Sequence, residues 1–189
     1  MKLKKLALVL TGALVSLSLL GCGAGGDQAK QASKLRVGAS IDFAPFEFQD
    51  EGQKDYQGFD MDLIRAVAKE MGSEAEIQNI GFDGLIPALQ AKNIDVIISG
   101  MTINDERKEK VAFSDPYYQS GLTMVVRSDE ENIKSFSDLK GHNVAAQIGT
   151  TGAKMAKEME GVTVSELNTP ADCFMELKAG GVDAVVNDR

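Results

Sequence analysis

The chain has 189 residues, of which 43% are hydrophobic and 25% are charged, with a net charge of −8, one histidine, two cysteines and no tryptophan. This composition is typical of a globular protein rather than a disordered or fibrous one, and the excess of acidic residues argues against a nucleic-acid partner, which usually requires a basic face. One histidine and two cysteines cannot supply an ordinary four-ligand zinc site without carboxylates, and the sequence shows no such cluster, so we expect no metal. We also expect no cofactor.

The first segment is predicted to be an export signal. Lysines at positions 2, 4 and 5 precede an apolar run from Leu6 to Leu20, which is too short to cross a bilayer comfortably. Gly21 and Cys22 follow in an arrangement that resembles the lipobox of bacterial lipoproteins. We therefore predict a lipoprotein signal peptide over 1–21, lipidation of Cys22, and a flexible polar tether over 22–33. A plain signal peptide with an incidental cysteine is the alternative.

From residue 34 onward, short β-branched runs alternate with helical patterns, which predicts parallel sheets built from βαβ units. The predicted strands are Leu35–Ser40, Glu74–Ile80, Ile94–Gly100, Leu122–Arg127, Asn143–Ile148, Val162–Leu167 and Val182–Asn187. The predicted helices are Asp60–Met71, Asp83–Ala91, Asn104–Val111, Ser135–Leu139, Thr151–Glu160 and Pro170–Ala179. In the first helix, the spacing places one apolar face on Met61, Ile64, Val67, Ala68 and Met71.

Some polar residues are predicted to be structural. Asp60 and Asp62 fall in the first turn of a helix, where acids are favourable. His142 follows a glycine and is expected in an exposed turn. Cys173 lies on a helix among apolar residues and is predicted to be a buried free thiol, and Ser135 is expected to cap the helix that follows it.

Three segments place polar groups where parallel strands end, which is where ligands collect in such sheets. They are Ser99–Thr102, followed by a helix that carries Arg107, then Gln147–Gly152, and Asn187–Asp188. A helix N-terminus with an arginine suits a carboxylate, and an aspartate suits an ammonium group. These groups together match a zwitterion.

A second interpretation of the charged residues stays open at this point. Without a family resemblance, Arg107 fits a solvated helix residue that pairs with Glu106 or Asp105 better than a binding residue, since surface ion pairs are common. Asp188 is equally consistent with a cap at the end of a strand.

Five motifs in register resemble a known family. They are Phe43–Glu47, Gly58–Leu63, Ser99–Thr102 with Glu106 and Arg107, Phe113–Tyr118, and Asp183–Asp188. In this order they are similar to the amino-acid-binding proteins of bacterial ABC importers, solute-binding family 3. The resemblance implies an α/β, two-lobed fold of the type II periplasmic-binding-protein kind, with a βα sheet in each lobe. Lobe 1 would span 34–121, and a hinge strand with a partial lobe 2 would span 122–189. Because relatives continue further, we expect a C-terminally truncated member whose second lobe is incomplete.

The resemblance also implies a site for an amino acid. The Arg107 guanidinium, the Gly100 N–H and the Thr102 and Thr151 hydroxyls would hold the α-carboxylate, and Asp188 would take the α-ammonium. Two phenylalanines would form walls for the side chain, although core packing explains them as well. The predicted ligand-binding residues are Ser40, Phe43, Phe82, Ser99, Gly100, Thr102, Arg107, Gln147, Thr150, Thr151 and Asp188.

Two positions near the expected tip of the ligand bear on its identity. At Ser40, relatives that bind glutamine or basic amino acids often carry an acid, which weakens the case for a cationic ligand here. At Gln147, glutamine binders carry a lysine, and its replacement removes a charge that would repel a cation. We therefore predict a polar amino acid and leave basic and amide side chains as alternatives.

The function that the resemblance implies is amino-acid binding outside the cytoplasm and delivery to an ABC permease. We expect a lipid-anchored monomer at the cell membrane that faces the periplasm or the exterior and is not an enzyme. The fold does not settle this, because dehydratase-like enzymes and ligand-sensing receptor domains resemble it.

Overall fold

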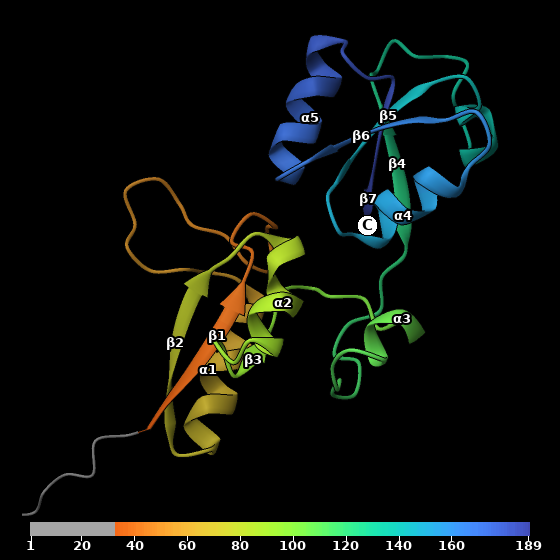
Figure 1. Cartoon of the computed structure of the whole chain (residues 1–189). Coiled ribbons are helices and arrows are strands. Elements are labelled where there is room, and N and C mark those ends of the chain that lie inside the picture. Colours follow the sequence, from red (N-terminus) through yellow and green to blue (C-terminus); the bar gives the residue numbers. More distant parts are fainter. Residues whose placement is uncertain (1–32) are drawn as a thin grey trace, which may run out of the picture. The chain divides into compact units, whose positions relative to one another are not determined.

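A computed structural model describes residues 33–189, which contain two separate β-sheets (Figure 1). The predicted signal peptide, Cys22 and the tether up to Ala32 lie outside the described residues and remain predictions. The strands are β1 (Ser33–Ala39), β2 (Ser73–Asn79), β3 (Val96–Ile97), β4 (Leu122–Val126), β5 (Asn143–Gln147), β6 (Thr163–Leu167) and β7 (Ala184–Asp188). The helices are α1 (Phe59–Glu70), the 3₁₀ turn η1 (Phe82–Gly84), α2 (Leu85–Gln90), α3 (Asp105–Lys108), the 3₁₀ turn η2 (Phe136–Leu139), α4 (Thr151–Glu158) and α5 (Pro170–Ala179).

The first sheet has the order β2-β1-β3, and all of its strands are parallel. Val37 and Ala39 on β1 pack with α1 on one face. Gly38 faces the other side, where a Cβ atom would lie 2.5 Å from Ile94 Cδ1 and 3.1 Å from Leu85 Cδ2. The absence of a side chain therefore lets helix α2 and the segment before β3 approach β1 closely. Strand β3 is shorter than predicted, so Ser99 and Gly100 lie in the turn that follows it.

The second sheet has the order β4-β7-β5-β6, with β4 antiparallel to β7 and the other pairs parallel. The expectation of wholly parallel sheets is therefore wrong at β4, which arrives from lobe 1 and joins the edge beside the last strand. Successive side chains of β5 point to opposite faces. Val144 packs into the core that contains Ala156 of α4, and Ala145 packs into the core that contains Cys173 of α5. Both faces of this sheet are thus covered by helices.

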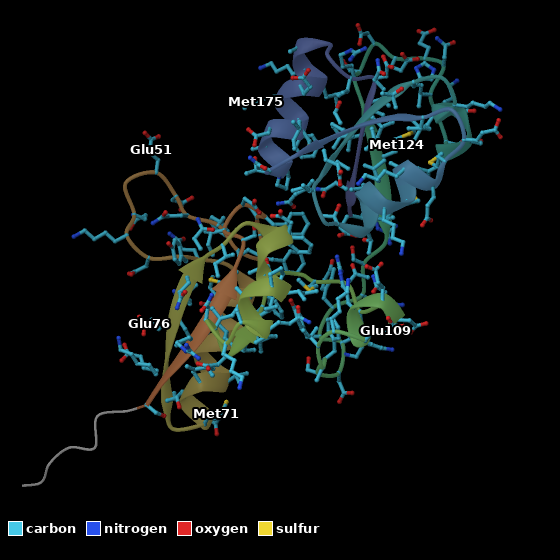
Figure 2. The ribbon with its side chains drawn as sticks, in the orientation of Figure 1. Glu51, Met71, Glu76, Glu109, Met124 and Met175 are labelled. Carbon is cyan, nitrogen blue, oxygen red and sulfur yellow. The ribbon has the colours of Figure 1, made fainter. Side chains whose placement is uncertain are left out.

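Helix α1 buries a narrower face than its sequence pattern predicts. Met61, Ile64 and Ala68 are buried, but Val67 is 41% exposed and Met71 is 62% exposed. Since each residue turns a helix by about 100°, Val67 is rotated away from the line of the buried residues. Met71 lies beyond the last residue of α1, at the surface (Figure 2).

Other local predictions can be compared with the structure. Cys173 is buried and free, as predicted, and burial raises the pKa of its thiol to about 11. Ser135 and Asp138 form the predicted capping box. His142 is half-buried rather than exposed, because its Nδ1 lies 3.2 Å from Asp183 Oδ2. Among the described residues, no helix is both long and apolar enough to cross a membrane.

Candidate functional site

The carboxyl ends of strands from both sheets border one cavity. In the first sheet, the chain passes from β1 to β2 on one side and then to β3 on the other, and β5, β6 and β7 repeat this arrangement in the second sheet. Ligands bind in open α/β sheets where the strand order reverses in this way. The cavity is lined by Asp42, Phe43, Glu47, Phe82, Ser99, Gly100, Thr102, Arg107, Gln147, Thr150, Thr151, Asn187 and Asp188.

All of the predicted ligand-binding residues except Ser40 line this cavity. Ser40 is buried behind the wall, where its hydroxyl donates to Asp42 Oδ2 at 3.0 Å. Two lining carboxyl groups, those of Asp42 and Glu47, were missed. Both follow β1 closely in the sequence, so their place after a buried strand was the available signal.

Arg107 occupies a buried position that its own short helix defines. The Asn104 side chain caps α3 by accepting from the Arg107 backbone N–H at 2.8 Å. The guanidinium donates from Nη1 to the Thr102 carbonyl at 2.7 Å and from Nη2 to the Gly149 carbonyl at 3.0 Å. Its central carbon lies 5.4 Å from the centre of the Phe82 ring. These contacts leave the side chain only 7% exposed.

The surface ion pair considered for Arg107 does not form. Glu106 instead accepts from Lys110 at 3.1 Å and from Lys154 at 2.8 Å, and these lysines lower its pKa to about 2. Within residues 33–189, Arg107 has carbonyl acceptors but no carboxylate partner. Burial lowers the pKa of its guanidinium, while the charges of Glu106 and Asp188 raise it. A buried cation without a paired anion at the wall of a cavity favours an anionic group there.

Asp188 supplies negative charge at the end of β7. Burial raises the pKa of its carboxyl group, and the charge of Arg107 lowers it. The same cavity therefore presents a guanidinium and a carboxyl group, each of which lacks a full ionic partner among the described residues. This pair is the arrangement that suits the two charged ends of a zwitterion.

Asp42 supplies a second carboxyl group near Gln147. Its Oδ2 accepts from the Ser40 hydroxyl and from Gln147 Nε2, each at 3.0 Å. Gln147 Nε2 also donates to the Asn168 carbonyl at 3.0 Å, which fixes its amide. Burial raises the pKa of Asp42, whereas its hydrogen bonds to Ser40 and Gln147 lower it. Some relatives carry an acid at the position of Ser40, and in this chain a carboxyl group is present two residues later, at Asp42.

The predicted role of the Gly100 N–H is wrong. This group donates to Asp60 Oδ2 at 2.9 Å and to the Tyr117 hydroxyl oxygen at 3.2 Å, so it points into the protein rather than toward a ligand. The reason is the turn after β3, in which Gly100 adopts a left-handed φ of +53°. Gly100 lines the cavity through its other atoms.

The N-terminus of α4 faces the same cavity. Thr150 caps this helix, since its Oγ1 accepts from the Ala153 N–H at 3.1 Å and donates to the Gln147 carbonyl at 2.7 Å. Thr151 is the first helical residue. The first N–H groups of a helix lack partners within the helix and carry partial positive charge, so they favour an anion.

The two sheets are joined by one connecting segment, and the cavity at their strand ends contains opposite charges and a helix N-terminus. This arrangement defines a two-lobed binding protein. The chain belongs to the family of bacterial extracellular solute-binding proteins, family 3, whose model matches residues 35–160. The predicted family and the two-lobed α/β fold are thereby confirmed.

Individual relatives and solved structures are similar to this chain over most of its length. The arginine-binding extracellular protein ArtP of Bacillus subtilis is 37% identical over 188 residues, which span 97% of this chain and 72% of ArtP. The structure of holo ArgBP from T. maritima is 50% identical with a TM-score of 0.80, over 82% of this chain and 69% of that one. A further structure is the ancestral amino-acid-binding protein AncCDT-1, described as a precursor of cyclohexadienyl dehydratase, with 45% identity and a TM-score of 0.79 over 82% and 70%.

Proposed function

We propose that this protein binds an amino acid with a basic or amide side chain outside the cytoplasm and delivers it to an ABC permease. The single observation that carries the proposal is Arg107, a buried cation at the cavity wall with Asp188 lining the same cavity. The α-carboxylate would bind Arg107, the Thr102 hydroxyl and the N-terminus of α4 at Thr151. The α-ammonium would bind Asp188.

The side chain of the ligand would lie between Phe43 and Phe82. Its tip would reach Asp42 and Gln147, while Ser99 and Thr150 would complete the wall. A carboxylate and an amide oxygen both accept hydrogen bonds, so this end of the cavity favours a guanidinium or ammonium group. Asp42 therefore favours the basic alternative, and the arginine-binding relatives support arginine as the first candidate.

The contacts between the lobes suggest how binding would be coupled to closure. Lys154 of α4 pairs with Glu106 at 2.8 Å, Gln147 donates to Asp42, and Arg107 donates to the Gly149 carbonyl. A ligand held by groups of both lobes interacts with the closed form more strongly than with an open one, so it would shift the population toward closure. The closed form would then be presented to the permease.

The proposal includes the location of the protein. A signal peptide over 1–21 and lipid on Cys22 would keep a monomeric chain at the outer side of the cell membrane, where its permease would lie. A dehydratase-like enzyme is the second candidate, favoured by the likeness to AncCDT-1. Turnover of a prephenate-like substrate by this chain would establish it.

A panel of amino acids tests the proposed function. We expect arginine, lysine, histidine and glutamine to raise the Tm in a thermal-shift experiment, because a ligand that binds only the folded state stabilises it in proportion to the logarithm of its concentration over Kd. Aspartate, glutamate and leucine serve as controls and should have little effect. A flat panel, or one that acidic amino acids lead, would contradict the proposal.

The cap of α4 offers a test of that helix in binding. Thr150→Ala and Thr169→Ala each remove a side chain that caps a helix, α4 and α5 respectively. Each should lower the free energy of unfolding by about 1 kcal/mol in urea denaturation. Only Thr150 lines the cavity, so calorimetry should show weaker arginine binding for Thr150→Ala alone. Equal affinities for the two variants would show that the Thr150 cap of α4 does not contribute to binding.

A further inference from the structure

Two acidic side chains are buried at the wall of the cavity, which Glu47 lines and Asp60 does not. Glu47 lies in the turn after β1 and is 1% exposed, and Asp60 lies in the first turn of α1 and is not exposed at all. Carboxyl groups are almost never this buried unless they have partners. The prediction that Asp60 is merely a favourable helix-start acid does not account for its position.

Each carboxyl group uses one oxygen to hold the turn after β3. The Ser99 hydroxyl donates to Glu47 Oε1 at 2.7 Å and accepts from the Ser40 N–H at 3.0 Å. Asp60 Oδ2 accepts from the Gly100 N–H and from the Tyr117 hydroxyl, both at 2.9 Å. The two carboxyl groups therefore fix adjacent residues of one cavity-lining turn.

The remaining oxygens have no donor among the described residues. Glu47 Oε2 and Asp60 Oδ1 are both fully buried and unpartnered there. Since the other oxygens of the two side chains hold the adjacent residues Ser99 and Gly100, the two carboxyl groups lie near each other. Two ionised carboxylates side by side in a buried site repel each other strongly. A single proton between them removes one charge and satisfies both oxygens.

We propose that Glu47 and Asp60 share one proton, and that this proton holds the Ser99–Gly100 turn in the shape that the amino-acid site requires. The second half of this proposal rests on the proposed function, whereas the first half does not. Both residues act through the turn and are positioning residues.

The groups around the pair indicate that Glu47 carries the proton. Asp60 Oδ2 already accepts two hydrogen bonds, from the Gly100 N–H and from the Tyr117 hydroxyl. Burial, together with the hydrogen bond to Asp60 and the charges of Asp60 and Asp42, raises the pKa of Glu47 to about 9, against the lowering effect of Ser99. Burial and Asp60 also raise the pKa of Tyr117, which keeps its hydroxyl as a donor. Arg107 lines the same cavity, but it makes no hydrogen bond to the pair.

The first experiment detects the proton without any ligand. Carbon-13 NMR of the glutamate carboxyl groups across a pH titration should show one resonance, absent from Glu47→Gln, that titrates near pH 9 instead of about 4.3. Asp60→Asn, which supplies a donor to Glu47, should lower the pH at which this resonance titrates. Glu51→Gln, an exposed glutamate in the same segment (Figure 2), is the matched control and should leave it unchanged.

Two results would contradict the shared proton. A Glu47 resonance that titrates in the ordinary range contradicts it, and so does an Asp60→Asn variant in which Glu47 titrates as before. In the second case, burial alone would protonate Glu47.

Thermal unfolding gives an independent measurement. Because the pKa of Glu47 is raised from 4.5 to about 9 on folding, the folded state holds one more proton than the unfolded state between these values. The stabilisation that this proton gives to the folded state is therefore complete below pH 4.5. It declines as the pH rises, and the unfolding equilibrium constant increases by up to about tenfold per pH unit. Glu47→Gln removes this decline, so its Tm relative to the wild type should increase between pH 5 and pH 8. A difference that stays constant with pH contradicts the proposal.

Binding of arginine tests the second half. At pH 10 the proton is lost from about 90% of molecules with a pKa near 9, so wild-type affinity should fall by up to about tenfold relative to Glu47→Gln. The ratio of the two affinities at pH 7 is the reference for this comparison. The ratio between the proteins cancels the titration of the ligand itself. A ratio that is the same at pH 10 as at pH 7 contradicts the positioning role, whereas an absence of arginine binding at every pH contradicts the proposed function and leaves the NMR result standing.

Discussion

Replacement of Arg107 by alanine is expected to weaken arginine binding by at least about 2 kcal/mol, or about thirtyfold in Kd. Arg107 is 7% exposed and its guanidinium has no carboxylate partner among the described residues, so the ligand α-carboxylate would be its counter-ion. Removal of one member of a buried charge pair also leaves the other member unpaired. Isothermal titration calorimetry at pH 7 measures the loss directly.

A neighbouring residue provides the control for this change. Lys108 is also on α3, but its side chain is exposed and only approaches Asp105 at 3.9 Å. Lys108→Ala should therefore bind arginine as the wild type does. The Tm of Arg107→Ala should be measured alongside, because the Thr102 and Gly149 carbonyls lose a donor in this variant. Unchanged affinity in a folded Arg107→Ala protein would rule out the assigned site.

Replacement of Asp42 by asparagine is expected to change selectivity rather than abolish binding. Asparagine keeps an oxygen that can accept from Ser40 and Gln147 but loses the charge that a guanidinium would contact. Hydrogen bonds to charged groups contribute about 1.5–3 kcal/mol, so the affinity for arginine should fall by about ten- to a hundredfold. The affinity for glutamine, which carries no charge on its side chain, should change much less.

The ratio of the two affinities is the decisive measurement for Asp42. Asp50→Asn removes an exposed acid from the same lobe and controls for the general effect of charge. A parallel loss of arginine and glutamine binding would mean that Asp42 only supports the wall of the cavity. No change in either affinity would place the tip of the ligand elsewhere.

Local patterns in the sequence predicted most of the elements, and the errors have physical causes. The cap at Ser135 and the alternation of strands and helices depend on neighbouring residues, which the sequence displays directly. The buried face of α1 was predicted too wide, because apolar spacing does not indicate how far the sheet extends beneath a helix. The direction of β4 depends on the strand beside which it packs, which local patterns do not specify.

The candidate site was predicted through motifs more than through chemistry. Apart from its family resemblance, Arg107 fitted a surface ion pair better than a binding role, because the sequence cannot show that Glu106 contacts Lys154 of the other lobe. Asp42 was not predicted as a site residue, because the acid that relatives carry was expected at the position of Ser40. Whether a side chain after a strand lines a cavity or lies behind its wall depends on the turn, and the turn is decided by packing.

The composition and charge of this chain, its predicted export signal and the order of its strands and helices follow from the sequence alone, because they depend on residues that are close together in the chain. The tertiary structure decided which strand ends border one cavity and that Glu106 pairs with Lys154 rather than with Arg107. It also decided that Glu47 and Asp60 hold adjacent residues of one turn, although 13 positions separate them. These features depend on burial and on contacts between distant segments. They determine which charges are left for a ligand and which carboxyl group keeps a proton.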